Sequence, residues 1–220
     1  MKNLTNFLLE SSSQTGKKYR LTDDTTRKNG KTLYRIEALK SFNDGWIKKG
    51  EKGGYIEKEE NLSQEGDCWV YDFGKVYDDA KVIDNASVSN DAEVYGNAVI
   101  SGNAMVYSGA YVYDNAKVYD NAKVHGGADV YGNAKIYDKA IVSGDAKVYG
   151  NAEVHGNAWV YDKTKVYDKG EVYDKAKVHG YARVFGNGKV YGDADARGNT
   201  KIGGNTKVSD NDDDLDYDLD

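Results

Sequence analysis

Three histidines and one cysteine are the side chains of this sequence best suited to catalysis or metal binding. His125, His155 and His179 could each serve as a general base. That role needs a partner that orients the ring and a pocket that holds the substrate. Each of the three follows a valine directly, in a position that other parts of the sequence fill with tyrosine. We interpret them as surface residues that replace tyrosine, and we expect no catalytic residue.

The same side chains do not suit a metal site. Zinc sites need three or four ligands that converge on one point. His125 and His179 are separated by three turns of the repeat described next, or roughly 14 Å at the usual strand spacing, and His155 falls on another face. Cys68 is the only cysteine, which excludes an internal disulfide. It occupies a position that small residues fill elsewhere, so we interpret it as packing. We expect no metal and no cofactor.

A repeat of six residues positions these side chains. Every sixth residue from Val70 to Val208 is Val or Ile, except Ala196, over 24 positions without an insertion. Two places later the residue is always Gly, Asp, Asn or Ser, and four places later it is Ala in 17 of 23 cases. The β-branched residue with its neighbours suits a short strand, and Gly, Asp or Asn suits a corner. The small Ala fits inside that corner.

Three such sides close a triangular coil, so the repeat predicts an all-β fold, a parallel β-helix of about eight coils stacked about 4.8 Å apart. Each inward valine then contributes about 1.5–3 kcal/mol of burial. An α-helix is excluded because a period of six matches no helical face. The stack is stable as a whole although no single coil can bury its own apolar face.

Four segments are expected along the chain. Residues 1–16 form a short helix or are disordered, and 17–67 form a β-rich cap with a hairpin turn at Lys28-Asn29-Gly30. Residues 68–209 form the β-helix, and 210–220 form an acidic disordered tail. A cap is required because a bare end exposes unpaired strand edges. The side chains expected to cover the first coil are Trp46, Ile47, Tyr55, Ile56 and Leu62.

Two stretches resemble a known family. The repeat Val-Tyr-Gly-Asn-Ala, found from Val130 and from Val148, resembles the hexapeptide repeat of left-handed parallel β-helix proteins. The sequences KYRLT, from Lys18, and GGYIEKEENLSQEGDCWVYD, from Gly53, resemble the YdcK-like hexapeptide-repeat proteins of bacteria and their prophages. The resemblance covers roughly 18–208. It implies a left-handed coil and a prophage or mobile-element accessory protein.

That family is often labelled acyltransferase by analogy of fold, which is a weak guide to function. The resemblance therefore also implies, as one alternative, acyl transfer from acyl-CoA. Hexapeptide acyltransferases generally use a histidine near a subunit boundary and a loop that leaves the coil. No insertion interrupts the repeat between 70 and 208 to supply such a loop.

One column of outward residues is aromatic in seven consecutive coils. Rings stacked across neighbouring strands stabilise a sheet by about 0.2–1 kcal/mol per pair. A row of tyrosines is also typical of binding surfaces, and both interpretations stay open. The members of this aromatic ladder are Tyr77, Tyr95, Tyr113, Tyr131, Tyr149, Tyr167 and Phe185.

Another face carries the most apolar exposed surface. An exposed patch of this kind marks an interaction site more often than not. We expect it to contact a protein partner, including a second copy of the chain in a homo-oligomer. Its residues, named here the apolar patch, are Met105, Tyr107, Ile141, Trp159 and Tyr161.

The charge distribution excludes other classes of partner. The formal net charge is −6, but the last eleven residues hold seven Asp, so the rest of the chain is close to neutral. Nucleic-acid binding proteins usually carry a strong basic footprint, so that function is not expected. No apolar run is long enough to span a membrane, and no signal-peptide pattern is present, so we expect a cytoplasmic protein.

The sequence thus predicts a non-enzymatic β-solenoid that acts as a binding or scaffold protein and engages a macromolecular partner. Two alternatives stay open. One is a phage-type inhibitor of a host defence enzyme, which the prophage resemblance and the acidic tail suggest. The other is a hexapeptide-repeat acyltransferase that uses acyl-CoA.

Overall fold

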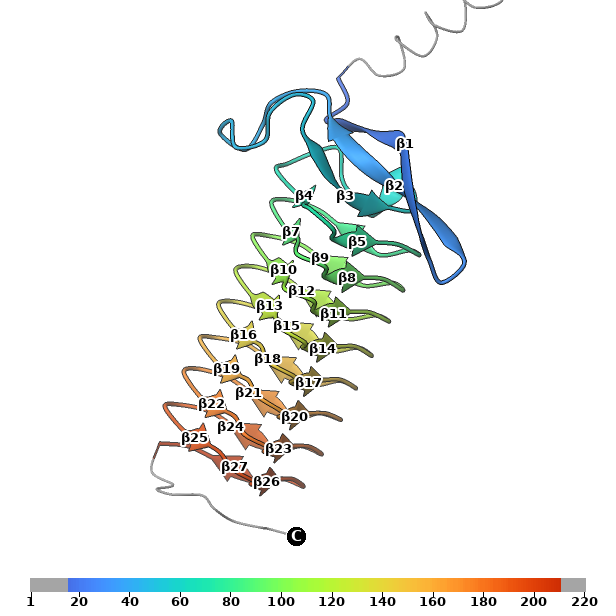
Figure 1. Ribbon diagram of the computed structural model, residues 1–220. Helices are drawn as coiled ribbons and strands as arrows, with labels where there is room; N and C mark the ends of the chain where they lie inside the picture. The colour runs from blue at the N-terminus through green and yellow to red at the C-terminus, as the bar shows by residue number, and fades with distance from the viewer. Residues whose placement is uncertain (1–15, 211–220) are drawn as a thin grey trace, which may run out of the picture.

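The fold is an elongated solenoid with a small cap at its N-terminal end (Figure 1). It is seen in a computed structural model that describes residues 16–210. The expected helix or disorder of 1–16 and the expected disorder of 210–220 lie, apart from Gly16 and Asp210, outside the described residues.

Strands β4 to β27 have two or three residues each and stack into three parallel sheets, one on each side of the solenoid. The ladder face, which bears the aromatic ladder, contains β5 (Lys75–Val76), β8 (Glu93–Val94), β11 (Tyr111–Val112), β14 (Asp129–Val130), β17 (Lys147–Val148), β20 (Lys165–Val166), β23 (Arg183–Val184) and β26 (Lys201–Ile202). The patch face, which bears the apolar patch, contains β4 (Trp69–Val70), β7 (Ser87–Val88), β10 (Met105–Tyr107), β13 (Lys123–His125), β16 (Ile141–Val142), β19 (Trp159–Val160), β22 (Lys177–Val178) and β25 (Asp195–Ala196). The third face contains β6 (Lys81–Val82), β9 (Val99–Ile100), β12 (Lys117–Val118), β15 (Lys135–Ile136), β18 (Glu153–Val154), β21 (Glu171–Val172), β24 (Lys189–Val190) and β27 (Lys207–Val208).

The core of the solenoid is the column of inward residues. Every Val or Ile of the six-residue series from Val70 to Val208 is at most 4% exposed. The Ala positions that follow the corners are buried beside them. In-register pairs such as Val112–Val130 and Val130–Val148 place each inward side chain directly against the next coil. The prediction of an all-β parallel β-helix with a β-rich cap is confirmed.

The corners depend on residues that tolerate positive φ. Asp114 (φ 56°) and Gly132 (φ 69°) occupy equivalent corner positions in successive coils, and such angles favour Gly, Asn and Asp. The Asp114 carboxylate also accepts a hydrogen bond of 3.2 Å from the Gly132 backbone N–H one coil later. The same contact joins Asp138 to Gly156 at 3.0 Å. Asp at a corner therefore both fits the backbone and ties two coils together.

The cap continues the sheet of the ladder face. Strands β1 (Tyr19–Lys28) and β2 (Lys31–Ala38) form the predicted hairpin, with Asn29 (φ 49°) and Gly30 (φ 79°) at the turn. Strand β3 (Lys52–Ile56) pairs antiparallel with β2 and parallel with β5. A short 3-10 helix, η1 (Glu59–Asn61), follows β3. Since β3 pairs with a strand of the cap and with a strand of the solenoid, the cap and the solenoid share one continuous sheet.

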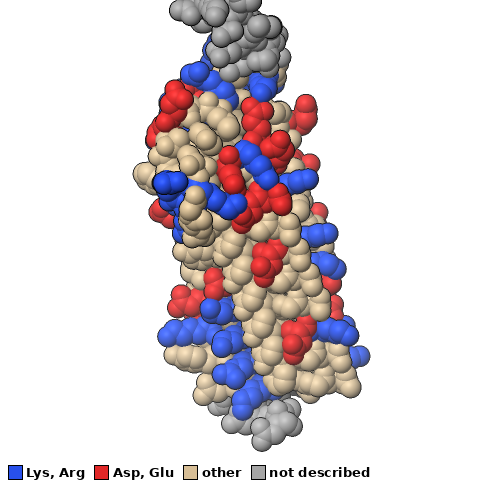
Figure 2. Space-filling view, turned by 90° about the vertical axis from the view of Figure 1, so that its right-hand side faces the viewer, with Lys and Arg blue, Asp and Glu red and all other residues tan. Residues whose placement is uncertain are grey.

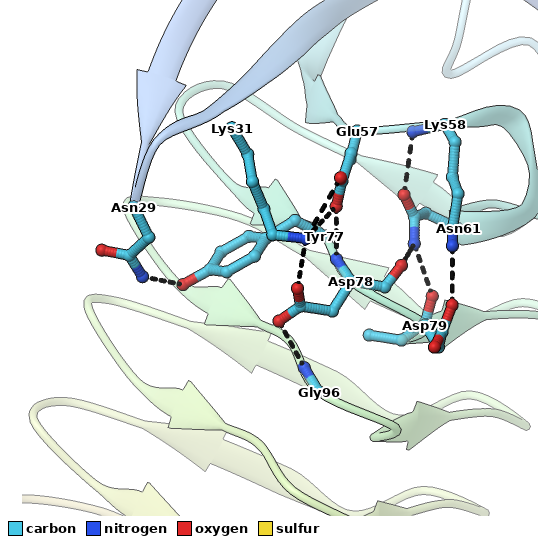
Figure 3. Close-up of polar contacts among 10 residues, drawn as sticks. Asn29, Lys31, Glu57, Lys58, Asn61, Tyr77, Asp78, Asp79 and Gly96 are labelled. Atoms are coloured by element: carbon cyan, nitrogen blue, oxygen red, sulfur yellow. Dashed lines mark hydrogen bonds and ion pairs between the residues drawn. The ribbon is translucent and has the colours of Figure 1, made fainter.

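Buried polar contacts fasten the cap to the first coils (Figure 3). The fully buried Asn61 amide donates to the carbonyl oxygens of Asp78 (3.0 Å) and Ala80 (2.9 Å). Lys31 lies between the carboxylates of Glu57 and Asp78. These contacts supply partners for groups that would be costly to bury alone, so the junction is specified in detail.

One side chain expected to cover the first coil does not do so. Ile47, Ile56 and Leu62 are buried as expected, but Trp46 is 81% exposed. Trp46 ends a tight turn whose preceding residues have positive φ, while Phe42 and Ile47 pair across it. Phe42 instead packs edge-on against Trp69, with ring centroids 5.3 Å apart.

Candidate functional site

The aromatic ladder is a continuous stack of rings. Successive ring centroids lie 4.8 to 5.4 Å apart and the rings are nearly parallel. The hairpin turn covers its first ring, Tyr77, whose hydroxyl donates to Glu93 at 3.2 Å. Further rings along the face are half-buried. The spacing matches the distance between coils, so the stack stabilises the sheet directly.

The phenols of Tyr77, Tyr95 and Tyr113 should resist ionisation until the protein unfolds in alkali. Burial, with nearby carboxylates such as Glu93, raises the pKa of Tyr77 and Tyr95, and burial with Asp129 raises that of Tyr113. Unfolded tyrosine has a pKa of about 10, so the unfolded state loses protons first and stability falls above that pH.

The ultraviolet absorbance of tyrosinate, followed with circular dichroism, checks this. We expect these three phenols to ionise together with loss of the β-sheet spectrum, above pH 10. Gradual ionisation of all phenols near pH 10 with the sheet intact would contradict the prediction.

The third face combines ring stacking with ion pairs. His155 lies between Tyr137 and Tyr173, with ring centroids 4.6 and 5.2 Å away. Glu153 accepts from Tyr137 (3.1 Å) and pairs with Lys135 (2.8 Å). These contacts satisfy most of the face internally, which leaves few polar groups to bind a ligand.

Two of the histidines have carboxylate partners that the sequence analysis did not identify. His155 Nε2 lies 3.1 Å from Glu171 and His179 Nε2 lies 2.9 Å from Asp195. Each carboxylate lies 16 residues after its histidine, in the next coil. The histidine directly follows an inward residue, and the carboxylate directly precedes the inward residue of the next coil, so the two outward side chains meet. That spacing is visible in the sequence and could have identified both pairs. Both imidazoles nevertheless lie on a sheet face and not in a loop-covered pocket.

The patch face holds an open hollow of about 500 Å³. Three apolar-patch residues, Ile141, Trp159 and Tyr161, line it. Met105, 42% exposed, lies two strands from Ile141, with Lys123 between them in register, and Trp159 is 49% exposed. The structure thus brings three patch residues together and places Met105 and Tyr107 beside them. The sequence analysis missed four further residues of the lining: His125, Ser143, Gly144 and Asp162.

His125 is the histidine at this hollow. Its ring stacks on Tyr107, with centroids 4.7 Å apart. Burial, with the nearby Lys123 ammonium, lowers the pKa of His125. The imidazole is therefore neutral near pH 7, the form that can accept a proton.

Cys68 is packed as expected, with a partner that the sequence did not indicate. The buried Lys18 ammonium lies 3.2 Å from Cys68 Sγ and donates to the carbonyl oxygens of Gly66 (3.2 Å) and Cys68 (3.0 Å). Burial lowers the pKa of Lys18 and raises that of the Cys68 thiol. Lys18 thus donates hydrogen bonds to carbonyl oxygens at the start of the first coil, where no preceding strand of the solenoid lies against them.

Residues 16–210 contain no group of three or more His, Cys, Asp or Glu side chains placed to hold a metal. In the same part of the chain, no helix has the length and apolar character needed to cross a bilayer.

One curated protein is similar to part of the chain. It is the uncharacterized acetyltransferase YdcK of Escherichia coli (strain K12), 42% identical over 65 residues, which are 26% of this chain and 19% of that protein. The chain is a parallel β-solenoid built on a six-residue repeat, and the matched part of it is similar to YdcK. No family model matches it. Because the match spans about a fifth of the relative's length, what YdcK does as a whole is not carried over to this chain.

Proposed function

We propose that the protein is a non-enzymatic β-solenoid that binds a protein partner through the apolar patch, and that this partner is a second copy of the chain. The observation that carries the proposal is the exposure of Met105 and Trp159 beside an open, mainly apolar hollow. On the third face, by contrast, carboxylates, lysines and rings already contact one another. An exposed apolar surface of this kind favours a protein contact.

Self-pairing fits the order of side chains along the patch face. A two-fold axis between β13 and β16 would set Met105 of one molecule against Trp159 of the other. Lys123 would then meet Ile141, and Lys177 would meet Ser87. No like charges on this face meet in that register, which removes the usual penalty for pairing a surface with itself.

The size of the face limits the affinity. Eight strands spaced by about 4.8 Å give a face roughly 35 Å long. With a width of about 15 Å it covers on the order of 500 Å², less than the ~800 Å² per partner of a standard interface. We therefore expect micromolar association.

The molar mass in solution tests the proposal. Light scattering across a concentration series should give a mass that rises toward that of a dimer at about 50 micromolar, a range suited to a weak interface. A mass that stays monomeric throughout would contradict self-association.

A second candidate, acetyl transfer, has a specific observation in its favour. The neutral His125 imidazole lines the open apolar hollow, and the similar YdcK is named an acetyltransferase. The geometry weighs against it. The hollow is open, and within residues 16–210 the His125 ring has a stacking contact with Tyr107 but no hydrogen bond that would orient it toward a substrate. Acyl transfer requires a base within hydrogen-bond reach of the acceptor and a site that excludes water.

We expect no acetyltransferase activity. Incubation with acetyl-CoA and a panel of amine and hydroxyl acceptors should release free thiol at the background rate. Turnover that His125→Ala abolishes, while His155→Ala and His179→Ala retain it, would overturn the expectation and identify the base. Turnover that survives all three substitutions would overturn it too, and would direct attention to the cap.

A further inference from the structure

The stack of rings on the patch face has a gap. The outward residues that follow the inward valines in β10, β13, β16, β19 and β22 are Tyr107, His125, Ser143, Tyr161 and His179. The first two stack on each other and so do the last two, each pair with centroids 4.7 Å apart. Ser143 lies in register between the two pairs and has no ring to join them. The hollow of the patch face is the space that this missing ring leaves.

The gap has the width of one aromatic ring. His125 and Tyr161 are two coils apart, which is about 9.6 Å at a spacing of about 4.8 Å between coils. On the third face a ring occupies the equivalent space, because the Tyr137 centroid lies 5.0 Å from that of Tyr119 and 4.6 Å from that of His155. A planar ring in the gap would lie equally close to the ring on either side.

The two edges of the gap differ in chemistry. Ile141 and Trp159 line the hollow on one side, and Asp162 lines it beyond the corner on the other. The Asp162 Oδ2 atom accepts a hydrogen bond of 3.1 Å from the Gly180 backbone N–H, which holds the carboxylate in place. A carboxylate can accept about four hydrogen bonds. The site therefore offers an apolar edge and an acceptor edge to a flat ligand.

A second gap in the same column has different edges. Ser89 also lies between two coils whose outward residue is a ring. There, however, the positions equivalent to Ile141 and Asp162 hold Ser87 and Ser108. The second gap therefore lacks the carboxylate and part of the apolar edge.

Charge sets the hollow apart from other surfaces of the solenoid. Figure 2 shows the side on which the hairpin of β1 and β2 lies, where Lys, Arg, Asp and Glu side chains all occur. Of the described residues that line the hollow, Asp162 alone is charged, because the His125 imidazole is neutral near pH 7. The local field therefore disfavours an anionic ligand, whereas the N–H donors of a neutral ring find an acceptor.

We propose that the gap above Ser143 binds a small molecule with a planar heteroaromatic ring whose edge carries N–H donors, the chemistry of the guanine base of a nucleoside. The ring lies between His125 and Tyr161, its donors face the Asp162 carboxylate, and its other edge lies against Trp159. Parallel rings attract when they stack with an offset, and a hydrogen bond to a carboxylate is stronger than one between neutral groups.

The proposal does not rest on self-association. A bound ring covers part of the apolar patch, so the ring and a second copy of the chain exclude each other. Binding is therefore measured on the monomer.

Ligand-observed NMR of guanosine tests the proposal. The protein is kept at about 5 micromolar, where a weak interface leaves it largely monomeric. Titration should give a dissociation constant of about 0.1–1 mM. Inosine, which lacks the exocyclic amino group, should bind at least about five-fold more weakly. The absence of saturable guanosine binding, or inosine binding of equal strength, would overturn the proposal. Neither result bears on self-association, which light scattering measures separately.

Ser143→Tyr supplies the missing ring from the chain itself. It should raise the dissociation constant for guanosine at least about ten-fold and retain the β-sheet spectrum. Ser101→Tyr is the matched control, because it places the same side chain at the equivalent outward position of the third face, and it should leave guanosine binding unchanged. Guanosine binding that Ser143→Tyr does not weaken would show that the ring is held elsewhere, contrary to the proposal.

Asp162→Asn tests the acceptor edge separately from the gap. Asn tolerates the positive φ of this corner, which is 60° at Asp162. The variant should weaken guanosine binding to about the level of inosine and leave inosine binding unchanged. An undiminished preference for guanosine over inosine would contradict the role given to the carboxylate.

Discussion

Val130→Asp should unfold the centre of the solenoid. Val130 is fully buried and lies in register between Val112 and Val148. A carboxylate there has no partner among these apolar neighbours, and the expected loss is at least about 4 kcal/mol. That is comparable to the whole stability of many domains, about 5–15 kcal/mol. Because each coil contacts only its neighbours, a break here separates the coils on either side.

Circular dichroism and amide hydrogen exchange measure this loss. We expect a much weaker β-sheet signal and fast exchange in the coils next to Val130. Lys139→Gln lowers the net charge by the same amount in the same coil at an exposed corner, and should change stability by no more than about 0.5 kcal/mol. If both variants unfolded at the same denaturant concentration, the inward placement of the valine series would be wrong.

The sequence predicted the solenoid well because one pattern decides both the local and the global structure. A slip of one residue would turn every inward valine to solvent, so an unbroken series from Val70 to Val208 admits one register. The first turn was harder to predict. Ile56 pairs with Val76 and Leu62 bridges to Val82, two residues more than the 18 of a regular coil. The segment between Leu62 and Cys68 absorbs the extra length and hides the repeat.

The candidate site was only partly predictable, because it depends on contacts between coils. The apolar patch could be predicted because each column of outward residues can be considered separately in the sequence. The pairs His155–Glu171 and His179–Asp195 join residues from two different columns. The contact of Lys18 with Cys68 joins the cap to the first coil, and no spacing rule indicates it.

Self-association through the apolar patch should be lost in Trp159→Lys with Ile141→Lys. Both side chains line the hollow, and two ammonium groups would have to lose water in the paired state. We expect the dissociation constant to rise at least about 100-fold. Phe73→Lys with Tyr111→Lys is the matched control, because these aromatic residues are also exposed and lie outside the patch. The control should associate as the unsubstituted protein does.

A charge swap tests the register of the proposed pair. Met105 of one molecule faces Trp159 of the other only if the two-fold axis lies between β13 and β16. Met105→Glu and Trp159→Lys should each weaken self-association, because each introduces a charge without a partner. A mixture of the two variants should regain association, since one of the two symmetric contacts then joins Glu to Lys. A mixture that stays monomeric would reject this register. Unimpaired association of either single variant would reject the patch itself as the contact surface.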